Sequence, residues 1–219
     1  MTPLQPIVSV EEAVVNALRE DILRLRLEPG ARLRMADVAE RAGVSLTPAR
    51  QALRRLEAEG LVVSSARLGS RVAPLTWADA EVVLAVCWAL ERRLIAAGVP
   101  RLQDGDLKQI KSLLKERDSA AKAHDVDHLV AAALRIREIV YARANRPYLA
   151  EQAVTWRRRQ QRYIQHARAT VPDSNAFLGS EFTAYVRACL RRDADAAEQA
   201  MGHIEDKLSE WLLKTLPAD

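Results

Sequence analysis

Apolar residues recur at helical spacing along most of this sequence, and glycine and proline divide the pattern into separate segments. The first segment runs from Ser9 to about Leu27, opens with a capping-box pattern and stops at Pro29-Gly30. Two shorter helical segments follow between Val38 and Val63, with Gly43 where the first of them needs a left-handed C-terminal residue. We therefore expect three helices in one small N-terminal domain.

The second of the two short helices has one polar side and one apolar side. On a helical wheel that starts at Thr47, the polar side comprises Thr47, Arg50, Gln51 and Arg54, and the apolar side comprises Ala49, Ala52, Leu53 and Leu56. A tight turn at Gly43 and Val44 before such a helix is typical of a helix-turn-helix. Ser45 or Thr47 can cap this helix, whose free N–H groups suit a phosphate.

The residues after this helix decide how its arginines are interpreted, because an arginine-rich amphipathic helix is by itself as often a solvated surface as a DNA-binding element. Two short β-prone runs between Gly60 and Val72 flank a turn that contains Gly69, with Arg67 and Arg71 on either side. This pattern predicts a β-wing whose tip can reach phosphates or the minor groove of DNA. The N-terminal segment is therefore interpreted as a winged helix-turn-helix.

From Pro74 onward the sequence shows only helical patterns, with no convincing strand as far as Leu216. Six helices are expected, at about 77–97, 105–124, 126–144, 147–169, 175–191 and 194–216. Short connections between helices of this length favour an antiparallel bundle. The predicted fold class is mainly α, with a winged helix-turn-helix domain at 1–75 and an antiparallel α-helical bundle of six to seven helices at 76–219.

Composition narrows the function only slightly. The 219 residues are 49% hydrophobic and 28% charged, and the formal net charge of +4 is too small to name a partner. Cys87 and Cys189 are far apart and lack a metal-type spacing, which favours a reducing cytoplasm over a disulfide scaffold or zinc site. We find no membrane-spanning run, no secretion signal, and no nucleophile–base pair or phosphate loop that would indicate an enzyme.

The stretch SLTPARQALRRLEAEGLV, from Ser45 to Val62, resembles the GntR family of bacterial transcription regulators. The helical remainder, with Asn145-Arg146-Pro147-Tyr148-Leu149, is similar to the FadR branch and specifically to its FCD-type members. The resemblance implies a homodimeric, ligand-responsive regulator, more often a repressor, that binds a near-palindromic operator in double-stranded DNA and has no membrane part. Residues expected at the DNA are Arg34, Ser45, Thr47, Arg50, Gln51, Arg54, Arg67, Gly69 and Arg71. One departure is Leu46, which stands where the family usually has an arginine.

A second departure concerns metal. FCD-type proteins often hold a divalent ion with an aspartate and three histidines, and counting back from Asn145 puts the first two positions at Ala132 and Ile136. The third position is Phe182, and only the fourth, His203, is a ligand type. A single imidazole cannot hold a labile divalent ion, so we expect no metal and no other cofactor.

The expected effector-binding residues are therefore Cys87, Ala132, Ile136, Tyr141, Phe182 and His203. Such a pocket would be unusually apolar, with His203 as its one polar side chain. A hydrogen-bonded histidine in the core is, however, at least as common at such a position. Two interpretations stay open: the pocket holds a largely apolar small molecule, or it has filled in and the protein is an architectural DNA binder. An enzyme with an accessory winged domain is the third and weakest alternative.

The fourth expected bundle helix is rich in arginine. It carries Arg157, Arg158, Arg159, Arg162 and Arg168. Because these residues point in different directions around a helix, the pattern favours a solvated face or a dimer rim over a second DNA contact.

Overall fold

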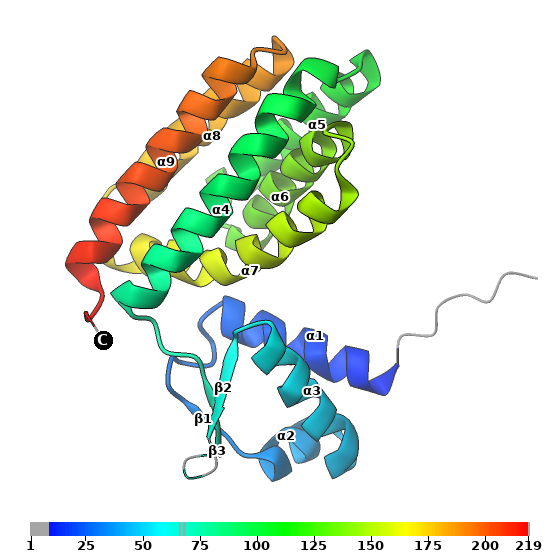
Figure 1. The fold of residues 1–219 in the computed structure, drawn as a ribbon, viewed down its shortest axis with the longest axis vertical. Coiled ribbons are helices and arrows are strands. Elements are labelled where there is room, and N and C mark those ends of the chain that lie inside the picture. The colour runs from blue at the N-terminus through cyan, green and yellow to red at the C-terminus, as the bar shows by residue number, and fades with distance from the viewer. Residues whose placement is uncertain (1–8, 66, 68, 219) are drawn as a thin grey trace, which may run out of the picture.

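The N-terminal part of the molecule combines three helices with a small sheet. The computed structural model describes residues 9–65, 67 and 69–218 (Figure 1). The helices are α1 (Val10–Leu23), α2 (Met35–Ala42) and α3 (Leu46–Ala58), and the strands are β1 (Arg32–Leu33), β2 (Val62–Ser65) and β3 (Gly69–Val72). Helix α1 ends at Leu23 rather than near Leu27, because Leu25 has a left-handed φ of 55° and the next two N–H groups bond back to Asp21.

The sheet contains one strand more than the sequence indicated. Its order is β1-β3-β2, and both pairings are antiparallel. The only strands predicted in this part lie between Gly60 and Val72, but Arg32 pairs with Arg71 and Leu33 pairs with Ser70. A strand of two residues is too short to show the alternation by which strands are recognised.

The C-terminal part is the expected helical bundle (Figure 1). Its elements are α4 (Trp77–Gly98), a short 3₁₀ turn η1 (Val99–Arg101), α5 (Asp104–Lys122), α6 (Val126–Arg143), α7 (Pro147–Thr170), α8 (Ser174–Leu190) and α9 (Ala194–Thr215). Side-chain caps at Thr76, Asp125 and Asp193 each accept a backbone N–H three residues further on. None of the helices in the described part of the chain combines the length and the apolarity that a membrane span requires.

Each part has its own hydrophobic core. One cluster of buried residues extends from Val14 to Val72, and the larger one extends from Leu75 to Leu216. Helix α7 lies on the side of the bundle that faces the winged part and contacts α1 (Figure 1). This position makes α7 the element through which the two parts touch most directly.

Candidate DNA interface and effector cavity

The helix-turn-helix is built as its pattern predicts. Gly43 ends α2 with a φ of 63°, and the apolar side of α3, from Ala49 to Leu56, is buried against α1 and α2. The N-terminal half of α3 lies at the end of the molecule away from the bundle (Figure 1). Ser45 takes the N-cap conformation of α3 without bonding its side chain to the helix, so its hydroxyl is not occupied there.

The expected DNA-contacting side chains are nearly all exposed. These are Arg34, Ser45, Thr47, Arg50, Gln51, Arg54, Arg67 and Gly69. Arg71 differs, because it is half-buried and donates to the carbonyl of Gly30 at 3.1 Å. Leu46, the departure from the family pattern, exposes 52% of its surface at the start of α3.

Ion pairing divides the arginines of the winged part into two groups. On the other faces, Arg19 pairs with Glu59, Arg24 with Glu20, Arg26 and Arg41 with Asp21, and Arg55 with Glu12. The side chains of Arg34, Arg50, Arg54 and Arg67 have no hydrogen-bond or ion-pair partner among the described residues. The side chain of Arg32 on β1 is exposed and equally without a partner there, and sequence reasoning missed it because β1 was not expected. Cations without acid partners are available to phosphates.

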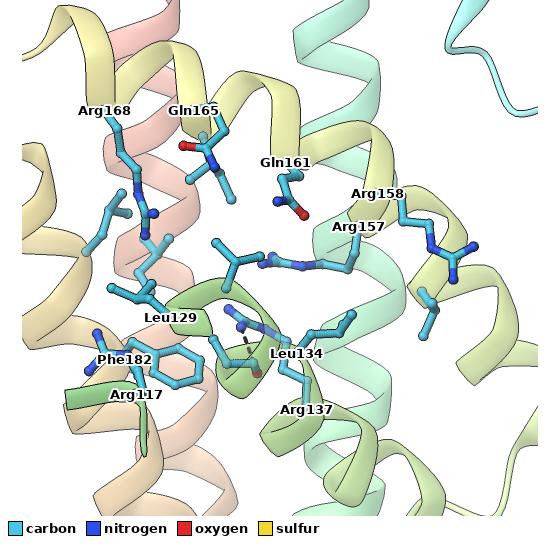
Figure 2. Close-up of a pocket in the computed structure, with 16 residues that line it drawn as sticks. Arg117, Leu129, Leu134, Arg137, Arg157, Arg158, Gln161, Gln165, Arg168 and Phe182 are labelled. Atoms are coloured by element: carbon cyan, nitrogen blue, oxygen red, sulfur yellow. Dashed lines mark hydrogen bonds between the residues drawn. The ribbon is translucent and has the colours of Figure 1, made fainter. Parts of the chain in front are cut away.

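The bundle encloses a cavity of about 90 Å³ between α5, α6, α7, α8 and α9. Nine of its lining residues are apolar: Leu129, Val130, Ala133, Leu134, Val154, Ile164, Leu178, Phe182 and Ile204. The other seven are Arg117, Arg137, Arg157, Arg158, Gln161, Gln165 and Arg168. In Figure 2, Arg157 and Arg168 reach into this space from α7, whereas Arg158 points away from it. The walls are therefore mostly apolar, as expected, but their polar groups are guanidinium and amide groups.

The structure corrects the expected lining at three of its positions. Ala133, Arg137 and Ile204 face the cavity, whereas the predicted Ala132, Ile136 and His203 are the residues directly before them. Ala132 and Ile136 are on α6 one residue before these lining residues, so their side chains point in a different direction around the helix. Phe182 lines the cavity as expected.

The remaining expected residues lie elsewhere. The side chain of His203 is 54% exposed and contacts Glu181 at 3.2 Å, so it is neither a cavity group nor a core histidine. Ala132 and Ile136 are buried in the helix packing, and burial raises the pKa of the Cys87 thiol. Tyr141 is buried and donates to Glu91 at 2.6 Å instead of lining the cavity.

The missed cavity arginines had a partial signal in the sequence. Arg117 follows Ile110 and Leu113 on the buried stripe of α5, where a charged residue needs a local reason. The carbonyl of Gly179 accepts from Arg117 at 3.2 Å, and the ring of Phe182 lies 4.9 Å from its guanidinium. Arg168 does not follow an apolar stripe in this way, and nothing in the sequence distinguishes it from the exposed residues beside it.

Profiles of two known protein families match the sequence of this chain. The profile of bacterial regulatory proteins of the gntR family matches residues 10–72, and the profile of the FCD domain matches residues 82–206, more than half of the chain. The protein belongs to the GntR family and carries an FCD domain. Among curated relatives, the HTH-type transcriptional regulator McbR of Escherichia coli K12 is 28% identical over 144 residues, which cover 66% of this chain and 65% of McbR.

Other relatives of this GntR-family chain match over shorter stretches. The uncharacterized HTH-type regulator YdhC of Bacillus subtilis is 28% identical over 105 residues, so the matched stretch spans about half of that protein and just under two thirds of McbR. The structure of E. coli McbR/YncC superposes with a TM-score of 0.79 at 23% identity, covering 95% of this chain and 99% of that one. A putative GntR regulator from Rhodococcus sp. RHA1 gives 0.76 at 18% identity, covering 93% and 97%. At these identities the likeness shows the fold.

A buried polar network lies directly beneath the cavity of the FCD domain. Glu91 is fully buried and accepts from Arg137 at 2.8 Å and from Tyr141 at 2.6 Å, with Arg157 at 3.4 Å. Burial opposes its ionisation, but Arg157 and Arg137 outweigh burial and hold the pKa of Glu91 below its usual value. Burial raises the pKa of the nearby Glu205 to about 7, although Arg157 acts in the opposite direction. The network therefore contains two guanidinium groups and two carboxyl groups.

The arginines of α7 also correct an expectation, because all of those named except the exposed Arg158 are at least partly buried. Arg159 donates to Asp79 at 2.6 Å and packs against Gly60, directly after α3. Arg162 is fully buried and donates to the carbonyl of Ala73, in the connection between the two parts. Arg157 and Arg168 line the cavity. One helix thus contacts the cavity on one side and the winged part on the other.

Proposed function

We propose that this protein is a transcription regulator of the bacterial cytoplasm that binds a near-palindromic operator as a homodimer. The observation that carries this is the distribution of charge in the winged part. Arginines on its other faces are neutralised by acids, whereas Arg34, Arg50, Arg54 and Arg67 face solvent without partners. An electrostatic surface of this kind matches the phosphate backbone of DNA.

In this proposal α3 enters the major groove with its N-terminus first. Ser45 and Thr47, beside the free N–H groups of that terminus, contact phosphates and fix the register. Gln51 and the arginines at positions 50 and 54 reach base edges, where guanine accepts a bidentate guanidinium. Arg67 and Gly69 at the wing contact the neighbouring backbone or minor groove. A second copy related by a two-fold axis reads the other half of the operator.

The bundle supplies the effector site. The cavity supports a small-molecule ligand over the architectural alternative, which required a filled interior. A ligand there changes operator affinity only by binding better in one placement of the winged parts than in another. Helix α7, which contacts both the cavity and Gly60, is the element positioned to transmit that difference. In this proposal the protein is a repressor, and ligand binding releases it from the operator. The bundle has no catalytic role in the proposal.

The proposal is tested with operator sites selected from a random pool of duplex DNA, measured by fluorescence anisotropy between 50 and 200 mM salt. Arg50→Ala should weaken specific binding by about 5- to 150-fold, the range for loss of a guanine contact. Arg55→Ala is the matched control, because Arg55 lies on the same helix but pairs with Glu12. It should bind within about 2-fold of the parent, with melting temperatures confirming that both variants are folded.

Two results would overturn the proposal. One is that the folded protein selects no sequence from the pool. The other is that Arg50→Ala and Arg55→Ala weaken binding equally, since the free and paired arginines would then be equivalent.

A further inference from the structure

The charges around the cavity do not balance. The guanidinium groups of Arg137 and Arg157 lie against the buried carboxyl groups of Glu91 and Glu205 at 2.8 to 3.7 Å, which accounts for two of the arginines. No Asp or Glu is among the described residues that line the cavity. Of the other lining arginines, Arg158 is exposed to solvent, so the positive charge that remains inside is that of Arg117 and Arg168.

Arg117 is only partly neutralised. Its acid partner, Asp118 at 3.0 Å, is 51% exposed, so solvent screens that ion pair, whereas the Arg117 side chain is itself only 7% exposed. The other partners of Arg117 are the uncharged Thr183 hydroxyl and Gly179 carbonyl. Burial lowers the pKa of Arg117, in agreement with incomplete compensation.

Arg168 is not neutralised at all within the described residues. It makes no hydrogen bond or ion pair there, and its Nε is buried without any partner. Figure 2 shows its side chain extending from α7 towards the part of the cavity that holds Arg117 and Phe182. Burial lowers the pKa of Arg168, and the nearby positive charge of Arg117 lowers it further. Two like charges in a partly dry site are unfavourable unless an anion separates them.

We propose that this cavity binds a compact organic molecule with a single carboxylate, held directly between Arg117 and Arg168 without a metal ion. This inference rests on the proposed function, since it names the ligand of the same effector site. The carboxylate accepts hydrogen bonds from the two guanidinium groups, which suits their planar geometry. The carboxylate offsets part of the positive charge of the two arginines, and the cavity of about 90 Å³ has room for only one such group with a short chain.

The rest of the cavity fixes the body of the ligand. Phe182 is held between two guanidinium groups, at 4.9 Å from Arg117 and 4.7 Å from Arg137, and forms an apolar wall with Leu178 and Ile204. At about 90 Å³ the free space is smaller than the cavity of about 150 Å³ that holds benzene in another protein. A short aliphatic acid therefore fits, and its chain lies against Phe182.

The residues that line the cavity support direct binding. Those that the structure describes there include no carboxylate, imidazole or thiolate, and the described residues contain no group of three or more ligating side chains. The guanidinium groups in the lining also disfavour a divalent cation. The arginines thus supply the positive charge with which a metal would have bound an anion.

The test compares propionate, butyrate and valerate with their uncharged amides and with inorganic phosphate, using the full-length protein, melting temperature and isothermal titration calorimetry. At least one acid should raise the melting temperature and bind in the presence of EDTA, and its amide should bind at least 10-fold more weakly. Arg168→Gln should weaken binding of that acid by about 10- to 100-fold, as expected for loss of a charge-assisted hydrogen bond. Arg187→Gln is the control and should retain binding, because Arg187 is an exposed arginine of α8 that does not line the cavity.

Four results would overturn the inference: no acid binds, an acid and its amide bind equally, Arg168→Gln binds as tightly as the parent, or binding needs added Zn²⁺. Binding of phosphate alone would also overturn it in favour of a different anion. Operator binding of the ligand-free protein is measured in parallel. If operator binding persists while no acid binds, only the ligand assignment fails and the proposed function stands.

Discussion

At the scale of single residues, Glu205 introduces a pH dependence that works against acid denaturation. Its pKa is raised to about 7 by burial, whereas a glutamate in an unfolded chain titrates near 4.3. The folded state therefore binds more protons between these values, and stability falls as pH rises from about 4 through about 7. The full effect of this one group is on the order of 3 kcal/mol.

Glu205→Gln should remove this dependence. Relative to the parent, the variant should unfold at similar urea concentration at pH 4.5 and at clearly higher concentration at pH 8, because only the parent buries a charged carboxylate there. Glu210→Gln on the same helix is the control, since Glu210 is exposed and its two lysine partners lower its pKa to about 2. An increase in the stability of Glu205→Gln over the parent that is equal at both pH values would contradict the prediction.

The cavity shows why single residues are hard to place from sequence. One residue along a helix rotates the side chain by about 100°, so Ala133 and Arg137 line the cavity while the expected Ala132 and Ile136, one residue earlier on α6, do not. The residue types were informative, because neither pair contains a metal-ligating group. The side-chain directions could not be predicted, because they depend on how the helices pack against one another.

At the scale of elements, local signals were sufficient to place nearly every helix. Caps such as Thr76 and Asp193 act within three residues, so each bundle helix begins and ends within one or two residues of its prediction. The arginines of α7 were misjudged because their partners, Asp79 and the carbonyl of Ala73, are about 80 or more residues away in the chain. Periodicity reports which side of a helix is polar, and it does not report what that side touches.

The end of α3 offers a direct measure of this long-range contact. Gly60 has a φ of 71°, and a Cβ there would lie 2.8 Å from Cζ of Arg159. Gly60→Ala should therefore lose stability in two ways: about 1–2 kcal/mol for the left-handed backbone, and a further loss for displacing Arg159. Gly43→Ala is the matched control, with a φ of 63° and no atom within 4 Å of the added Cβ.

In urea denaturation, the Gly60→Ala variant should have a lower free energy of unfolding than the Gly43→Ala variant. This difference in stability should disappear when both substitutions are made in an Arg159→Ala background. Equal losses for the two glycines in the parent background would show that α3 and α7 are not in energetic contact.

At the scale of the whole molecule, the same contact predicts how ligand and operator communicate. The guanidinium of Arg159 lies between the end of α3 and Asp79 at the start of α4, while its helix neighbours Arg157 and Arg168 line the cavity. If the proposed carboxylate draws Arg168 inward, we expect the packing of α7 against the winged part to change. Coupling free energies between such sites are typically about 1–3 kcal/mol, which corresponds to a 5- to 150-fold change in operator affinity.

Arg159→Ala should separate binding from communication. In the parent, a saturating amount of the best-bound acid should lower the affinity for the operator by a factor in that range. Saturating operator should lower the affinity for the acid by the same factor, because linkage is reciprocal. In Arg159→Ala both partners should still bind, since Arg159 lines neither the cavity nor the exposed side of α3, but the factor should approach one. Arg93→Ala, which removes an exposed arginine of α4, is the control and should keep the parental factor. An undiminished factor in Arg159→Ala would mean that ligand and operator are coupled through another route, such as the connection at Ala73 that Arg162 holds.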